Sequence, residues 1–95
     1  MKLKTIGAVL GSPVLQSLSP AIHNAAFARM SKPWRYVAID VDAEYFEEEV
    51  IAARDAGMLG LSITMPHKDA AFALVQHRDD VAQRSGSVNT IIFDD

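Results

Sequence analysis

The apolar residues of this chain fall into four short runs, and segments with helical spacing separate the runs. The runs are TIGAVL (5–10), WRYVAIDV (34–41), LGLSIT (59–64) and SVNTIIF (87–93). Their lengths and their β-branched and aromatic residues are typical of strands. Strands that alternate with helices at this spacing predict right-handed crossovers and a mostly parallel sheet with helices on both faces. The predicted fold is an α/β three-layer sandwich.

The first helix is predicted to begin at Ser19, with Ser19 as its N-cap and Pro20 in its first turn. The helix is predicted to run through Ile22, Ala26 and Met30, which recur at a spacing of four, and to end before Pro33. In the second helix Asp42 is the expected cap. Its buried stripe is predicted to contain Phe46, Val50 and Ala53, and Glu47, Glu48 and Glu49 are expected to lie mostly in solvent.

Two shorter helices complete the predicted order βαβαβααβ. One covers residues 68–75, and the other, capped by Asp79 or Asp80, ends near Gly86. Because the chain stops at Asp95, directly after a strand-like run, we expect a piece of a longer protein that is truncated before a closing hairpin strand.

Composition limits the classes of partner. The chain has 95 residues, 49% of them hydrophobic, which suits one compact domain spanning 1–95. Its net charge of -3 and its scattered basic residues argue against nucleic acid as the leading partner. There is no cysteine, and the apolar part of the N-terminus is too short for a membrane span or a signal peptide. The simplest compartment is the cytosol, with no membrane partner.

Polar side chains gather near the ends of the predicted strands, where sheets of this kind bind ligands. The candidates are Ser17, Ser19, Ser62, Thr64, Lys68 and Asn89. A role as the N-cap would explain Ser19 but not Ser17, which precedes the cap. The hydroxyls of Ser17 and Ser19 can both donate to one carboxylate. Lys68 is a cation in the first turn of a helix, which the helix dipole disfavours, so either a solvated lysine or a proton-transferring one fits it equally. Thr64 and Asn89 taken alone are ordinary strand and turn residues.

Other kinds of site are not favoured. His23 is interpreted as a helix-face residue, His67 as a loop residue near Lys68, and His77 as a surface residue, and their spacing predicts no metal site. The sequence has no glycine-rich loop of the GxGxxG or Walker type for a dinucleotide or a nucleoside triphosphate.

Three segments resemble the substrate-contact segments of one enzyme family. GSPVLQSLSPAIHNAAF, LSITMPHKDAA and SVNTIIF are similar, in this order, to segments in the N-terminal domain of shikimate dehydrogenases, NADP-dependent enzymes of aromatic amino-acid biosynthesis. The resemblance covers residues 6–93. It implies that Ser17 and Ser19 hold the carboxylate of shikimate, that Thr64 and Asn89 contact the substrate, and that Lys68 is the catalytic lysine.

The resemblance also implies what lies elsewhere. NADP would be bound by a C-terminal Rossmann domain that residues 1–95 do not contain, and the family's aspartate partner of the lysine would lie beyond the hairpin. Ser62 stands where the family usually has asparagine, and Gln16 where histidine is common. We therefore expect the isolated chain to bind shikimate or 3-dehydroshikimate weakly at best and to have no dehydrogenase activity.

Two other functions stay open, a quinate dehydrogenase domain and a stand-alone module that binds a hydroxy acid without chemistry. An unpaired strand at Ile91 and Ile92 would also be an exposed edge that can pair with a second copy.

Overall fold

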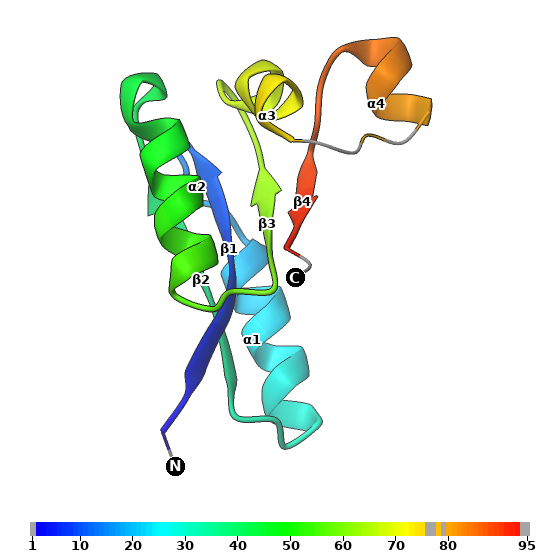
Figure 1. Cartoon of the computed structure of the whole chain (residues 1–95). Helices are drawn as coiled ribbons and strands as arrows, with labels where there is room; N and C mark the ends of the chain where they lie inside the picture. The colour runs from blue at the N-terminus through cyan, green and yellow to red at the C-terminus, as the bar shows by residue number, and fades with distance from the viewer. Residues whose placement is uncertain (1, 76–77, 79, 94–95) are drawn as a thin grey trace.

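The structure is a computed structural model that describes residues 2–75, 78 and 80–93 (Figure 1). In chain order the elements are β1 (Lys4–Gly11), α1 (Ser19–Arg29), β2 (Trp34–Asp40), the 3-10 helix η1 (Ala43–Tyr45), α2 (Phe46–Asp55), β3 (Gly60–Ile63), α3 (Lys68–Leu74), α4 (Asp80–Ser85) and β4 (Thr90–Ile92). The predicted order of strands and helices is confirmed. The last strand is shorter than the predicted run 87–93.

The four strands form one sheet in the order β2, β1, β3, β4. β1 lies in the middle and pairs in parallel with both β2 and β3, whereas β4 runs antiparallel to β3. The sheet is therefore mostly parallel, as predicted, with one antiparallel strand at its edge. The carboxyl ends of β1, β2 and β3 meet at one end of the sheet, and β4 begins there.

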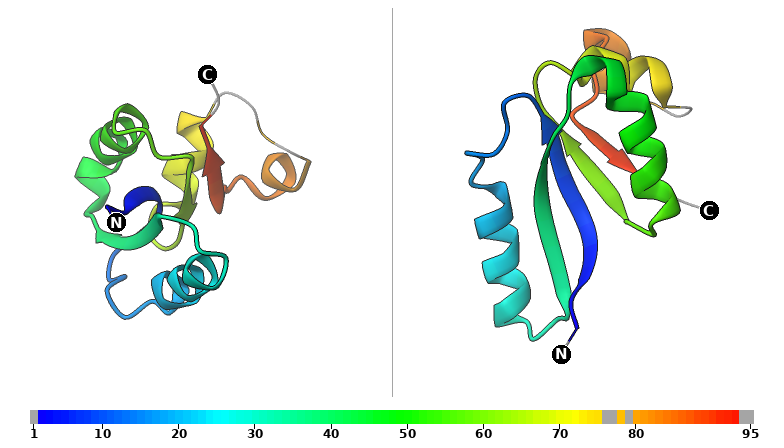
Figure 2. Two further views of the ribbon diagram at one scale, coloured as in Figure 1. Left: turned by 90° about the horizontal axis from the view of Figure 1, so that it is seen from below. Right: turned by 90° about the vertical axis from the view of Figure 1, so that its left-hand side faces the viewer.

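Helices cover both faces of the sheet, so the three predicted layers are confirmed. α1 lies on one face and α2 on the other (Figure 2). The larger core cluster lies between the sheet and the helices that follow β2, and Phe46 is one of its largest fully buried side chains. A smaller cluster on the α1 face contains Val9, Val14 and Tyr36, with Phe27 of α1 packed against it.

The residues whose spacing predicts α1 do not form its buried face. Ile22 and Met30 are 65% and 53% exposed, and Ala26 is also exposed. The half-buried residues of this part of the helix are Asn24 and Phe27. The Asn24 amide donates to the Tyr36 carbonyl at 2.9 Å and accepts from the Tyr36 N–H at 2.8 Å.

That pair of hydrogen bonds explains the orientation of α1. β2 is an edge strand. β1 pairs with the backbone groups on one side of β2 and leaves those on the other side without a strand partner. A side-chain amide is the group that can satisfy an N–H and a C=O at once. The hydrophobic contrast around an alanine-rich helix is weak, and this polar contact determines which side meets the sheet.

The prediction for α2 holds for its buried face and fails for its cap. Phe46, Val50 and Ala53 are buried, and Glu47 and Glu48 are exposed. Asp42 precedes η1 instead of α2, and its side chain makes no capping hydrogen bond. The chain enters α2 through a 3-10 turn, which continues directly into the first turn of the α-helix.

The segment predicted as the third helix contributes Phe72 and Val75, which pack against the larger core. Asp79 and His77 lie outside the described residues. Among the helices that the structure describes, none is long and apolar enough to cross a membrane.

We predict that Asn24→Ala lowers the free energy of unfolding by about 1–3 kcal/mol, because it leaves two half-buried backbone groups of β2 without a partner. The matched control is Ile22→Ala on the solvent side of the same helix, which should change that free energy by less than about 0.5 kcal/mol. Urea denaturation of both variants provides the measurement. A larger loss for Ile22→Ala than for Asn24→Ala would contradict the observed orientation of α1.

Candidate functional site

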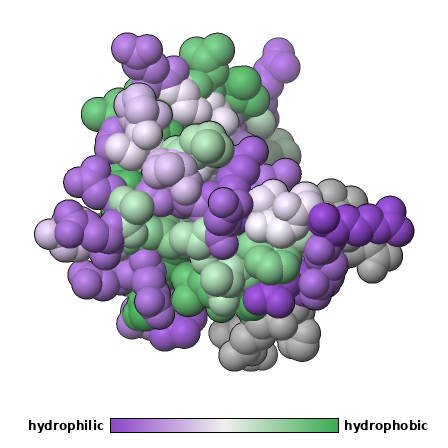
Figure 3. Space-filling model, turned by 90° about the horizontal axis from the view of Figure 1, so that it is seen from above, coloured by the Kyte–Doolittle hydropathy of each residue, from purple (hydrophilic) through white to green (hydrophobic). Residues whose placement is uncertain are grey.

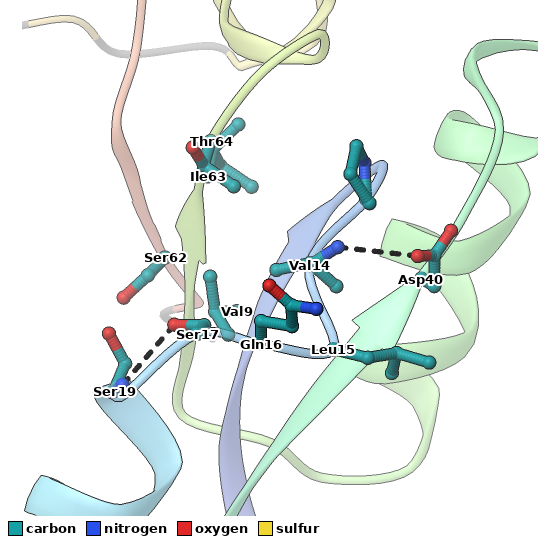
Figure 4. A pocket seen from close by; sticks show the side chains of 11 residues that line it. Val9, Val14, Leu15, Gln16, Ser17, Ser19, Asp40, Ser62, Ile63 and Thr64 are labelled. Atoms are coloured by element: carbon teal, nitrogen blue, oxygen red, sulfur yellow. Dashed lines mark hydrogen bonds between the residues drawn. The ribbon is translucent and has the colours of Figure 1, made fainter.

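A pocket of about 590 Å³ lies at the carboxyl ends of β1, β2 and β3 (Figure 4). Seen from this end of the molecule, hydrophilic and hydrophobic residues are intermixed on the surface (Figure 3). The pocket is lined by Val9, Pro13, Val14, Leu15, Gln16, Ser17, Ser19, Asp40, Ser62, Ile63 and Thr64. Four of the six predicted site residues are therefore brought together, although they come from two segments more than forty residues apart in the sequence.

Backbone hydrogen bonds join the loops around the pocket. The N–H of Ser12 donates to the Met65 carbonyl at 3.0 Å, and that of Thr64 donates to the Leu10 carbonyl at 3.0 Å. Gly11 lies between these bonds, where a Cβ would overlap the Thr64 side chain. A glycine at this position lets the loop after β1 lie directly against the end of β3.

Ser19 does not have the capping role predicted for it. The Oγ of Ser17 accepts from the N–H of Ser19 at 3.2 Å, and Leu18 is the residue that precedes the helix. The predicted N-cap at Ser19 is wrong because the chain already turns before it: the Ser17 N–H donates to the Val14 carbonyl at 2.9 Å. A serine hydroxyl that accepts from the backbone N–H two residues later forms a common type of turn.

Both serine hydroxyls remain able to donate into the pocket. Ser17 uses a lone pair for the Ser19 N–H, so its hydroxyl hydrogen is still available. Pro20 has no N–H, and the Ile22 N–H donates to the Leu18 carbonyl at 3.1 Å. The backbone at the start of α1 therefore offers few donors, and the hydroxyls are the principal groups there that can bind an anion.

Asp40 lies on the side of the pocket opposite the serines (Figure 4). Its Oδ2 accepts from the Val14 N–H at 3.3 Å, which links the end of β2 to the loop that carries the serines. Because its negative charge repels a ligand carboxylate, an anionic group is favoured at the serine side. The sequence alone did not indicate that Asp40 lines the pocket. In the sequence, Gln16 stands out only as a departure from the family pattern.

Side chains alternate between the core and the pocket along β3 and the residue that follows it. Leu61 and Ile63 are buried in the core, and Ser62 and Thr64 are half-buried at the pocket. The phenol of Tyr36 donates to the Ser62 Oγ at 2.6 Å. Nothing in the spacing of the sequence indicates this contact, because the two residues lie on strands that do not pair with each other.

Lys68 and Asn89 do not line the pocket, although backbone bonds place both beside the end of β3. The Ile63 N–H donates to the Asn89 carbonyl at 2.8 Å, and the Val88 N–H donates to the Lys68 carbonyl at 3.1 Å. Lys68 is half-buried at the start of α3, and Asn89 is exposed, with its Oδ1 accepting from the Thr90 hydroxyl at 3.2 Å. Within the described part of the chain, no carboxylate forms an ion pair with Lys68.

His67 precedes Lys68 in a loop, as predicted, and its side chain is fully buried. Its Nε2 lies 2.6 Å from the Val41 carbonyl, which can only accept, so Nε2 carries the hydrogen. Its ring stacks on Phe46 with centroids 4.7 Å apart. His67 thus holds the loop before Lys68 against the end of β2. Residues 2–75, 78 and 80–93 contain no cluster of side chains suited to a metal ion.

Comparison with known proteins matches residues 9–91 to a family described as the shikimate dehydrogenase substrate binding domain. A shikimate dehydrogenase (NADP(+)) of Methanopyrus kandleri is 45% identical over 85 residues, which are 90% of this chain and 29% of that protein. The solved shikimate 5-dehydrogenase of Thermus thermophilus, in complex with NADP(H) and shikimate, is 38% identical with a TM-score of 0.84, and the match covers 90% of this chain and 33% of that one.

A shikimate 5-dehydrogenase of Listeria monocytogenes, solved in complex with shikimate and NAD, is 30% identical with a TM-score of 0.90. That match covers 98% of this chain and 32% of the Listeria chain. The present chain spans about a third of the length of the relatives that it matches.

The hydrogen bond from the Ser19 N–H to the Ser17 hydroxyl leads to a prediction. Ser17→Ala should lower the free energy of unfolding by about 1 kcal/mol, because it removes the acceptor for the Ser19 N–H. Ser19→Ala, the matched control in the same turn, should cost less than about half of that. Thermal denaturation of the two variants tests this order, and a costlier Ser19→Ala would restore Ser19 as the cap.

Proposed function

Because the chain belongs to the family of shikimate dehydrogenase substrate-binding domains, we propose that its pocket binds shikimate and 3-dehydroshikimate. The observation that carries this proposal is the convergence of four hydroxyl groups on one pocket, from Ser17, Ser19, Ser62 and Thr64. Hydroxyls are donors and acceptors at once, which suits a ring with several hydroxyl groups and one carboxylate.

The charge distribution supports one orientation of the ligand. Ser17 and Ser19 bind the carboxylate, at the side of the pocket away from Asp40. Ser62 and Thr64 then face the ring and its hydroxyl groups. Asn89 and Lys68 extend the site beyond the end of β3, as their backbone bonds to the neighbouring segments suggest.

In the longer protein to which this domain would belong, Lys68 assists the oxidation of one ring hydroxyl to a ketone. Lys68 would accept the proton of that hydroxyl, and NADP+, when bound, would supply the oxidant that takes up the hydride. We place NADP in a second domain outside the matched segment. The NADP(+) in the names of curated relatives and the one-third coverage support that division.

Quinate is the second candidate ligand. Ser62 is smaller than the asparagine usual at this position and leaves more room for the additional ring hydroxyl of quinate. The cytosolic location expected from the sequence stays a prediction.

We expect saturable amide shifts when the isotope-labelled 95-residue chain is titrated with shikimate in two-dimensional NMR, clustered at Ser17, Ser19 and Thr64. The double variant Ser17→Ala/Ser19→Ala should weaken binding by at least about tenfold, because it removes two hydrogen bonds to a charged group. Quinate is titrated in parallel as the competing ligand. Addition of NADP should give no turnover in this chain. A well-dispersed spectrum that shikimate leaves unchanged would refute the proposed function.

We also propose that β4 pairs with a second copy of the chain. β4 is bonded to β3 on one side only, and Ile92 is 76% exposed. Analytical ultracentrifugation should show a dimer at high protein concentration, which Ile92→Lys should abolish. A wild-type chain that stays strictly monomeric would contradict this proposal.

A further inference from the structure

We propose that Tyr36 is a positioning residue for the ligand, which acts by fixing the hydroxyl of Ser62 in the pocket. The Tyr36 phenol donates to the Ser62 Oγ at 2.6 Å, and Ser62 lines the pocket. This inference rests on the proposed function, because it identifies the group that determines how one side of the pocket recognises the ring of shikimate.

The Tyr36 ring reaches Ser62 across a strand. Tyr36 is on β2 and Ser62 on β3, and β1 lies between them. Tyr36 pairs with Gly7 of β1, where a Cβ would lie only 3.0 and 3.1 Å from two atoms of the tyrosine ring. A side chain at that position would force the ring away. The glycine therefore lets the phenol cross the central strand.

Several contacts hold Tyr36 in place. Asn24 of α1 bonds both its N–H and its carbonyl, and His23 of the same helix stacks on its ring with centroids 4.2 Å apart. Tyr36 is only 7% exposed, whereas Ser62 is half-buried at the edge of the ligand space. The phenol is thus a fixed donor, and the serine is the group that it orients.

The chemical consequence concerns the hydroxyl hydrogen of Ser62. An isolated serine hydroxyl rotates and can act as donor or acceptor toward a ligand. Here the phenol occupies one lone pair of the Oγ, which leaves the serine hydrogen to be donated to a group in the pocket. A hydrogen bond that is already donated to the Oγ also strengthens the one that the serine donates in turn. Ser62 therefore presents a fixed donor to an oxygen of the ligand ring.

This arrangement offers an account of Ser62 at a position where asparagine is usual in the family. Asparagine carries its own N–H donors on a planar amide, whereas serine has a single, rotatable hydroxyl. The buried phenol supplies the orientation that the serine lacks. The pocket should then discriminate against ring analogues without the corresponding oxygen, because the Ser62 donor would be left unpaired.

A double-mutant cycle tests the inference on the 95-residue chain. Tyr36→Phe removes only the phenol oxygen and keeps the ring against Gly7 and His23. We expect Tyr36→Phe and Ser62→Ala each to weaken shikimate binding by about 3- to 10-fold in calorimetric titrations. The double variant should bind no more weakly than Ser62→Ala alone, because the two side chains act as one unit. The matched control is Tyr45→Phe, which removes a phenol oxygen from the exposed tyrosine of η1 and should leave the affinity unchanged.

A spectroscopic measurement supplies a second readout that needs no change at Tyr36. The ring-carbon resonance next to the Tyr36 hydroxyl should shift on addition of shikimate to the wild-type chain, and this shift should disappear in Ser62→Ala. Amide spectra of all variants verify that they are folded.

The possible outcomes separate the two proposals. Wild-type binding that Tyr36→Phe leaves unchanged would overturn the role of Tyr36 and leave the proposed function intact. Additive losses in the cycle would show that Tyr36 does not act through Ser62, which also overturns the inference. A wild-type chain that does not bind shikimate would refute the proposed function, and the inference would fall with it.

Discussion

The parallel pairing of β1 with both β2 and β3 is the constraint on which the pocket depends. Parallel strands end at the same edge of a sheet, so each loop that follows one of them lies beside the other loops. The loop after β1 brings the serines, the end of β2 brings Asp40, and the end of β3 brings Ser62 and Thr64. The antiparallel β4 begins where these strands end, which places Asn89 beside them.

The central strand β1 contributes to the site mainly through two glycines, which have no side chain. Gly7 and Gly11 lie on β1 four residues apart, and each faces a side chain from a neighbouring strand or from the loop after it. Tyr36 occupies the space beside Gly7, and Thr64 occupies the space beside Gly11. Because β1 carries no side chains at these two positions, groups from β2 and from the end of β3 can approach the pocket across it.

Much of the fold could be predicted from the sequence because its signals are local. The strand runs and the buried stripe of α2 follow from periodicity and residue type. The buried side of α1 could not be predicted in this way, since apolar residues occur on all sides of the helix and the decisive contact joins Asn24 to a distant edge strand. The roles of Ser17 and Tyr36 likewise depend on a turn and on a crossing between strands, neither of which leaves a periodic pattern in the sequence.

One helix links the two sides of the proposed ligand site. α1 begins at Ser19, on the proposed carboxylate side of the pocket, and its His23 and Asn24 contact Tyr36, whose phenol donates to Ser62. A shift of α1 relative to β2 would therefore move Ser19, one of the proposed anion ligands, relative to Ser62 of β3. The distance between these two groups, which a ligand of fixed size must match, is set by how α1 docks on the sheet. The two hydrogen bonds between Asn24 and Tyr36 fix the position of α1 along β2 as well as its contact with the sheet. An apolar stripe would allow α1 to shift along the strand, so the hydrogen bonds are the better anchor.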